Sequence, residues 1–364
     1  MKFKTMSVHS GQRIDPQTGA LTTPLYQSST FSYFNAQAGK ERFAGQAPGF
    51  IYSRFGNPTT AELELKLAAL EGADEALVVA SGMAAVSAIM YALADSGDEV
   101  AYIGPLYGGT DAFLKQTFSR AGITITSYDS DQDLLANISP ATKVILFETL
   151  TNPTLKVVDP RVVVEAARKV GAITVCDNTF LTPYLLRPLE LGIDIVMHSG
   201  TKYLGGHGDI IAGVVAGSHA LMKSIRTVAL KHIGSPIGPQ EAYLLQRGVK
   251  TLPLRMDAHL HNAQKVADFL AAHPAVKKVI YPGLASHPGH DALGLGPSPP
   301  RPPEGVWKRT ATSNEFDRDR RYMKNHRLHS HRHPSHKHAT ASTIAGGIEP
   351  SINGVEIPSS KTWC

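Results

Sequence analysis

The chain has 364 residues, more than one ordinary hydrophobic core needs, and its 42% hydrophobic content is that of a globular protein. Its apolar runs are short or interrupted, so they indicate no transmembrane helix, and the N-terminal segment 1–7 lacks the apolar core of a signal peptide. Only Cys176 and Cys364 occur, which argues against a disulfide framework and favours a reducing cytoplasm.

The net charge of +5 is confined to one end of the chain. Residues 294–364 hold 11 Lys/Arg and 6 Asp/Glu, so residues 1–293 are neutral. A basic tail is weak support for nucleic-acid recognition by the rest of the protein. We therefore expect no specific nucleic-acid partner and no membrane partner.

Residues 1–60 are predicted to form an extended N-terminal arm, because β-forming residues there are punctuated by proline. A helix is predicted to start near Asn57-Pro58-Thr59-Thr60, ahead of a run of strong helix formers.

From about residue 70 to 215, short apolar runs alternate with helical stretches. This rhythm predicts an α/β fold, a mostly parallel sheet with helices on both faces, whose ligands bind at the carboxyl ends of the strands. The predicted strands are 76–80, 99–103, 144–147, 173–176 and 193–197, and the predicted helices include 83–94, 110–121 and 160–170.

One lysine among glycines and hydroxyls is the most informative position in this region. Lys202 lies in Ser199-Gly-Thr-Lys-Tyr203, and Asp177 follows an apolar run. An amine and a distant carboxylate are what pyridoxal phosphate (PLP) requires, the first for a Schiff base and the second for the pyridine nitrogen. Taken singly, Lys202 could be a surface lysine and Asp177 a strand-end cap.

The phosphate of such a cofactor needs several hydrogen-bond donors. Gly82 and Met83 begin a predicted helix, where free N–H groups and the helix dipole favour an anion. Ser199 and Thr201 could add hydroxyl donors. A glycine at a strand-to-helix turn is common, so this motif alone is weak.

The second half of the chain is predicted to be less regular. Residues 216–276 look helical, and 276–281 is expected to be a strand that opens a smaller domain. Residues 294–364 show little apolar periodicity and are expected to be largely disordered. Six histidines lie within 325–338, but no zinc framework is present, so we predict no metal site.

Five motifs occur in order: Tyr52–Thr59, Ala80–Ala84, Glu148–Thr154, Asp177–Phe180 and Ser199–Tyr203. Together they resemble the PLP-dependent cysteine/methionine metabolism (transsulfuration) family over residues 7–293. The resemblance implies the PLP-dependent transferase fold type I with an incomplete C-terminal small domain. It implies an arm at 1–60, a PLP-binding large domain at 61–250, the start of the small domain at 251–293, and a non-family tail at 294–364.

The resemblance also implies roles for individual residues. Lys202 would carry the aldimine and move protons, and Asp177 would pair with the pyridinium nitrogen. Tyr107 would stack on the ring and could protonate a leaving group. Glu148 and Asn152 would contact the edge of the cofactor.

In the family, the residues that correspond to Tyr52 and Arg54 bind the phosphate of the neighbouring subunit. The resemblance therefore implies at least a dimer, and typically a homotetramer. Arginine suits phosphate binding because of its forked donors.

The expected activity is γ-elimination from methionine, cystathionine or homocysteine-type substrates. The family alternative is γ-replacement on an O-acylhomoserine, as in cystathionine γ-synthase or a homoserine-ester sulfhydrylase. Family members also carry a C-terminal arginine that grips the substrate carboxylate, and residues 294–364 contain no matching segment. A catalytically impaired homologue is therefore a further alternative.

Overall fold

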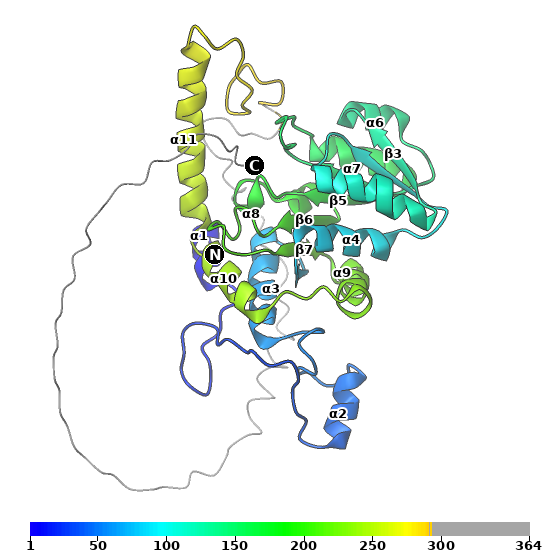
Figure 1. The fold of residues 1–364 in the computed structure, drawn as a ribbon, viewed down its shortest axis with the longest axis vertical. Coiled ribbons are helices and arrows are strands. Elements are labelled where there is room, and N and C mark those ends of the chain that lie inside the picture. Colours follow the sequence, from blue (N-terminus) through cyan, green and yellow to red (C-terminus); the bar gives the residue numbers. More distant parts are fainter. Residues whose placement is uncertain (291, 293–364) are drawn as a thin grey trace, which may run out of the picture. The chain divides into compact units, whose positions relative to one another are not determined.

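A computed structural model describes residues 1–290 and 292, which all belong to one compact unit. Its centre is a seven-stranded sheet in the order β1-β7-β6-β5-β4-β2-β3 (Figure 1). The strands are β1 (Glu75–Val79), β2 (Glu99–Ile103), β3 (Thr124–Tyr128), β4 (Thr142–Glu148), β5 (Ile173–Asp177), β6 (Ile195–Ser199) and β7 (Gly213–Gly217).

The sheet is mostly parallel, which confirms the predicted fold class. Strands β3, β2, β4, β5 and β6 pair in parallel, whereas β7 runs antiparallel to both β6 and β1. At one end of the β6–β7 pair, Ser199 lies opposite Gly213. Both ends of the segment that carries Lys202 are therefore held by neighbouring strands.

Helices cover both faces of the sheet because successive strand residues point to opposite sides. On one face, α4, α9 and η4 pack against Leu77, Val175 and Met197. On the other face, α3 and α10 pack on β1 and β7, and α6 and α7 pack on β2, β4 and β5. The main helices are α3 (Pro58–Glu71), α4 (Gly82–Leu93), α6 (Asp131–Asn137), α7 (Pro160–Val170), α9 (His219–Arg226), the π-helical η4 (Thr227–Ile233) and α10 (Pro239–Val249).

Helix ends follow local sequence rules. Helix α3 has the Asn57 side chain as its N-cap and Pro58 in its first turn, and it ends at Gly72, whose φ is 72°. Helix α7 begins after Asp159 in the same way and ends at Gly171. A proline in the first turn and a left-handed glycine after the last turn are the expected stops, because they satisfy or spare the unpaired backbone groups.

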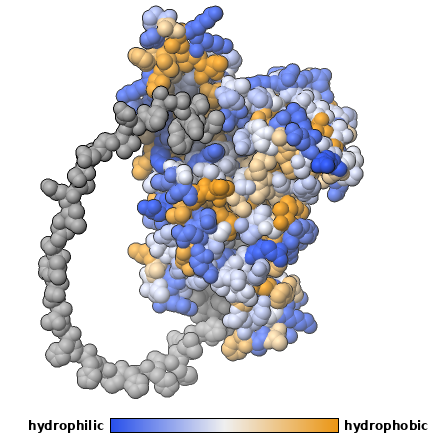
Figure 2. Space-filling model, in the orientation of Figure 1, coloured by the Kyte–Doolittle hydropathy of each residue, from blue (hydrophilic) through white to orange (hydrophobic). Residues whose placement is uncertain are grey.

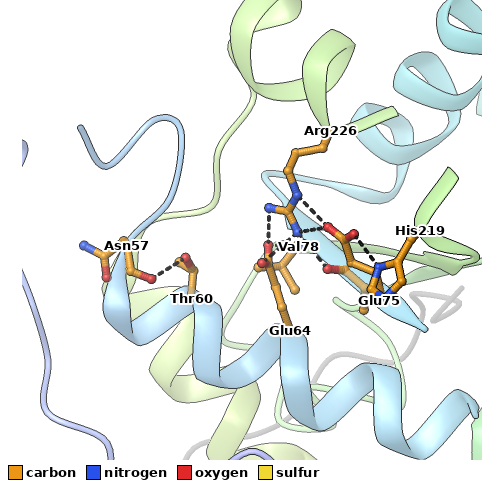
Figure 3. A network of polar contacts seen from close by, with 8 residues as sticks. Asn57, Thr60, Glu64, Glu75, Val78, His219 and Arg226 are labelled. Carbon is orange, nitrogen blue, oxygen red and sulfur yellow. Dashed lines mark hydrogen bonds and ion pairs between the residues drawn. The ribbon is translucent and has the colours of Figure 1, made fainter. Parts of the chain in front are cut away.

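An arginine network joins three elements on the α9 side. Arg226 at the end of α9 bonds both carboxylate oxygens of Glu64 from α3, and it reaches Glu75 at the start of β1 (Figure 3). His219 contacts the other oxygen of Glu75. Burial raises the pKa of Glu64, and the Arg226 charge opposes that rise. The network therefore fixes α3 and α9 to the first strand.

Three expectations need correction. The arm at 1–60 is not wholly extended, because it holds α1 (Phe3–His9) and α2 (Ala36–Phe43). The helix expected at 110–121 is divided into α5 (Gly108–Ala112), the π-helical η1 (Phe113–Thr117) and the 3₁₀ turn η2 (Phe118–Ala121). Residues 276–281 form no strand.

The region after α10 begins with the long helix α11 (Leu252–Ala272). Two short helical segments, α8 (Thr182–Leu185) and η3 (Pro188–Leu191), lie between β5 and β6. Val266 and Phe269 on α11 are exposed, and apolar surface is visible near the tip of this helix (Figure 2). No helix among the described residues is long and apolar enough to cross a membrane. The predicted tail at 294–364 and its histidine cluster lie outside the described residues.

Candidate active site

The site residues gather where three neighbouring parallel strands end. Glu148, Asp177 and Ser199 are the last residues of β4, β5 and β6. Glu148 and Asp177 are partners in the β4–β5 register. The carboxyl ends of parallel strands meet at one edge of the sheet, so the topology brings together residues 51 positions apart in the sequence.

The start of α4 lies against the end of β6. A β-carbon at position 82 would lie 3.0 Å from the Ser199 Cβ and 3.3 Å from its Oγ, so only glycine allows this approach without displacement. Ser81 caps α4 by accepting from the Ala84 N–H. The N–H groups of Gly82 and Met83 have no partner within the described helix, and they are free to bind an anion.

We call the N–H groups of Gly82 and Met83, with the neighbouring Ser199 hydroxyl, the anion cradle. The hydroxyls of Ser199 and Thr201 differ in their hydrogen bonds. The Ser199 hydroxyl has no hydrogen bond to any described residue, and it lies beside Gly82. The Thr201 hydroxyl accepts from the Ala212 N–H at 3.1 Å and makes a long 3.4 Å contact with the Ala212 carbonyl. A phosphate contact from Thr201 would replace that weaker bond.

A threonine hydroxyl links Asp177 to Ser199. Thr179 donates its hydroxyl to Asp177 Oδ1, and the same hydroxyl oxygen accepts from the Ser199 N–H at 2.8 Å. The Thr179 N–H also bonds Asp177 Oδ1. The carboxylate is thereby fixed in direction relative to the loop that carries Lys202.

Burial raises the pKa of Asp177, while the two bonds from Thr179 and, more weakly, the charge of His198 lower it. The His198 Nε2 lies 2.5 Å from a carboxylate oxygen of Glu71, and both side chains are only 1% exposed. Burial destabilises the charged form of a carboxylate, and a cationic partner offsets that destabilisation. Asp177 therefore suits a protonated ring nitrogen.

Lys202 is exposed at this edge. Its backbone N–H bonds the Ser199 carbonyl, and its carbonyl accepts from Gly206, so the main chain is held while the side chain is not. Within the described residues the ammonium has no hydrogen bond or ion pair. Its amine is therefore available to a ligand.

Tyr107 is 51% exposed and lies in the loop between β2 and α5. Its N–H bonds Glu148 Oε1 at 2.6 Å, and the Asn152 N–H bonds Glu148 Oε2 at 3.2 Å. Both Glu148 oxygens therefore accept from backbone. Burial, and then the charge of Asp177, raise the Glu148 pKa to about 7.

The remaining predicted pair, Tyr52 and Arg54, contacts a different part of the chain. Arg54 donates to the carbonyls of Leu230 and Lys231 in η4, and its guanidinium lies over Phe55. Within the described chain, neither residue bonds Lys202, Asp177 or Ser199. Their expected contact with a second subunit stays a prediction.

Sequence reasoning missed Thr179 and His198 as parts of this site. Both lie inside the recognised motifs, but their contribution depends on contacts with Ser199 and Glu71 that spacing does not reveal. No group of three or more His, Cys, Asp or Glu suited to a metal occurs in the described part.

The chain is similar to known proteins over most of its length. The family model described as "Cys/Met metabolism PLP-dependent enzyme" matches residues 4–294. The chain is 47% identical over 289 residues to L-methionine gamma-lyase of Pseudomonas putida, which covers 79% of this chain and 73% of that protein. It is 44% identical to cystathionine gamma-lyase of Bacillus subtilis, with coverage of 80% and 75%.

Solved structures have the same fold. One is a putative O-acetylhomoserine (thiol)-lyase of Campylobacter jejuni, with a TM-score of 0.77, 34% identity and 81% of both chains covered. That structure carries a pyridoxyl-lysine phosphate at its position 205. Cystathionine gamma-lyase of Lactobacillus plantarum, complexed with L-serine, matches with a TM-score of 0.75 and 40% identity over 81% of this chain and 75% of that one.

Proposed function

Because this chain belongs to the Cys/Met metabolism family of PLP-dependent enzymes, we propose that it is a carbon–sulfur lyase that catalyses γ-elimination from methionine- or cystathionine-type amino acids. The relatives named above as methionine and cystathionine gamma-lyases support this reaction class. The structural observation that carries the proposal is the juxtaposition of Gly82 with Ser199, next to the Thr179-bridged Asp177.

One group of residues is suited to hold the phosphate and the ring nitrogen of PLP. Bound PLP supplies an electron sink that stabilises negative charge on the substrate Cα. Gly82 and Met83 donate N–H groups to the phosphate with the hydroxyl of Ser199, and Thr201 adds a donor when it releases Ala212. Asp177 holds the proton at the ring nitrogen because its own buried charge favours a cation.

Lys202 and Tyr107 act on the substrate side. The Lys202 amine would hold the cofactor, and the same amine would carry a proton at the substrate α and β carbons. The exposed Tyr107 ring would contact the bound cofactor, and its hydroxyl would deliver a proton to the departing sulfur. Glu148 and Asn152 line the site next to Tyr107.

A second candidate reaction is γ-replacement on an O-acylhomoserine. The likeness to the putative O-acetylhomoserine (thiol)-lyase at 34% identity supports it. Elimination and replacement share the loss of the Cα proton and differ in whether a thiol adds at the γ carbon. The third candidate is a homologue that binds PLP and turns over poorly.

One experiment separates the three. The full chain is loaded with PLP, and methionine, cystathionine, and O-acetylhomoserine with a thiol are offered in turn. Release of a 2-oxo acid, ammonia and the substrate's own thiol when no thiol is added supports elimination, and formation of a thioether with the added thiol supports replacement. A PLP-loaded protein without turnover supports the impaired homologue. Failure to bind PLP, or borohydride fixation unchanged in Lys202→Ala, rejects the site itself.

The active unit is at least a dimer, in which Tyr52 and Arg54 serve the neighbouring subunit. Arg54 contacts η4 rather than its own Ser199 cradle, which supports a role outside its own site. Tyr52 is 40% exposed and therefore accessible to a second chain.

A further inference from the structure

The Glu148 carboxylate stands between the loops that follow β2 and β4. It is only 6% exposed, and each of its oxygens accepts one backbone N–H, from Tyr107 at 2.6 Å and from Asn152 at 3.2 Å. Two charge-assisted bonds to two separate loops fix their spacing. Each oxygen therefore commits one of its acceptor positions to the backbone of a different loop.

We infer that Glu148 is a positioning residue, whose ionised carboxylate clamps the Tyr107 loop to the Asn152 turn and so sets where the Tyr107 ring lies. The effect of the clamp on catalysis rests on the proposed function. The clamp itself consists of contacts within the protein and does not require the cofactor. The clamp also connects the site to the sheet, since Glu148 is the last residue of β4.

The electrostatic setting makes the clamp sensitive to protonation. Asp177 is the register partner of Glu148, and its charge adds to burial in raising the Glu148 pKa to about 7. The Cys176 thiol, next to Asp177 on β5, is buried. Burial raises the thiol pKa well above its usual value, so the thiol stays neutral. Below about pH 7 the carboxyl group gains a proton, and one of the two acceptors is weakened.

Glu148→Gln tests the clamp, because an amide keeps the shape but offers one oxygen and turns its NH₂ group toward the second donor. Glu148→Asp keeps the charge and shortens the reach by one methylene. The matched control is Glu99→Gln: Glu99 lies at the opposite end of neighbouring β2 and, among the residues that the structure describes, accepts only from the Thr142 hydroxyl.

The primary readout is amide hydrogen exchange of segments 105–109 and 150–154 in the apoprotein. We expect both clamp variants to raise exchange in at least one segment by about tenfold or more, and Glu99→Gln to leave both unchanged. Unchanged exchange in Glu148→Gln overturns the inference. If that variant does not fold, wild-type apoprotein is compared at pH 6 and pH 8 after correction for intrinsic rates. Greater protection at pH 8 supports the clamp, and equal or lower protection overturns it.

A second readout follows the loaded protein. In Glu148→Gln we expect the visible circular dichroism of bound PLP to decrease and its Kd to rise about tenfold. The loss should be much smaller in a Tyr107→Ala background, because a residue that acts through the ring has little left to position. Additive losses overturn the role through Tyr107. If wild-type protein binds no PLP, the proposed function fails while the exchange result still decides the clamp.

Discussion

Asp177 and Glu148 are register partners at the ends of β5 and β4, and burial, followed by the charge of Asp177, raises the pKa of Glu148. Burial raises the pKa of Asp177 as well. Two acids at one edge of a sheet are costly to keep ionised together, and a cationic ligand at Asp177 relieves that cost. The apoprotein is therefore electrostatically prepared for a positively charged group.

The first prediction concerns pH and stability. The Glu148 pKa rises from 4.5 to about 7 on folding, so its stabilising contribution is fully present below 4.5 and is lost as pH rises through 7. Relative to Glu148→Gln, wild-type apoprotein should lose up to roughly 3 kcal/mol of unfolding free energy between pH 4 and pH 8. Urea unfolding at both pH values measures this, and a pH-independent difference between the two proteins contradicts it.

The second prediction concerns the anion cradle. Gly82→Ala places a β-carbon 3.0 Å from Ser199 and should weaken PLP binding by about tenfold or more, measured by absorbance titration. Gly108→Ala is the control, because Gly108 also begins a helix and a β-carbon there meets nothing within 4 Å. Equal affinities in the two variants would show that the close approach has no part in binding.

The third prediction concerns the Thr179 bridge. Thr179→Val removes a donor to Asp177 and leaves the Ser199 N–H without its acceptor, at a cost of about 1–3 kcal/mol in unfolding free energy. Thr124→Val on the exposed edge strand β3 should change stability by less than about 0.5 kcal/mol. Chemical denaturation compares the two, and equal effects would argue against the bridge.

The fourth prediction tests the shared site between subunits. Lys202→Ala cannot fix PLP covalently, and Arg54→Ala should bind it weakly. Mixed after dissociation, the two variants should regain roughly a quarter of wild-type sites that borohydride fixes at low PLP, because half of the random dimers are hybrids with one intact site. Mass spectrometry counts the label. A mixture no better than its parents would mean that Arg54 serves its own subunit or none.

The fifth prediction concerns the α9 network. Arg226→Ala leaves Glu64 largely buried without its cation and should cost about 3 kcal/mol of unfolding free energy. Glu64→Gln in that background should restore part of the loss. Lys115→Ala breaks the more exposed pair with Asp111 and should cost less than about 1 kcal/mol. Thermal unfolding of the four proteins decides whether the pairing or the side-chain volume matters.

Regular, strongly apolar elements could be predicted from sequence alone. Helix α7 has the bounds expected from its proline and glycine stops, and five strands lie where the apolar runs placed them. Strand β3 was missed because its sequence, Thr124-Ile-Thr-Ser-Tyr128, alternates with polar residues at a sheet edge. Strand β7 was missed because glycines flank its apolar core.

The strand expected at 276–281 fails for a different reason. The segment has strand-forming residues, but no described strand lies beside it to pair its backbone. Propensity alone does not make a strand. In the site, the family motifs point to Lys202 and Asp177, whereas the bond from Thr179 to Ser199 spans 20 positions and could only be seen in three dimensions.

The antiparallel strand β7 helps to fix the path of the Lys202 segment. Ser199 and Gly213 face each other across the β6–β7 pair, so the stretch from 200 to 212 leaves and re-enters the sheet at adjacent points. The stretch also packs on the helices that follow: Leu204 is 1% exposed, Arg255 of α11 donates to the Tyr203 carbonyl, and Gly248 of α10 lies close against Gly205. The place of Lys202 therefore depends on α10 and α11 as well as on the sheet.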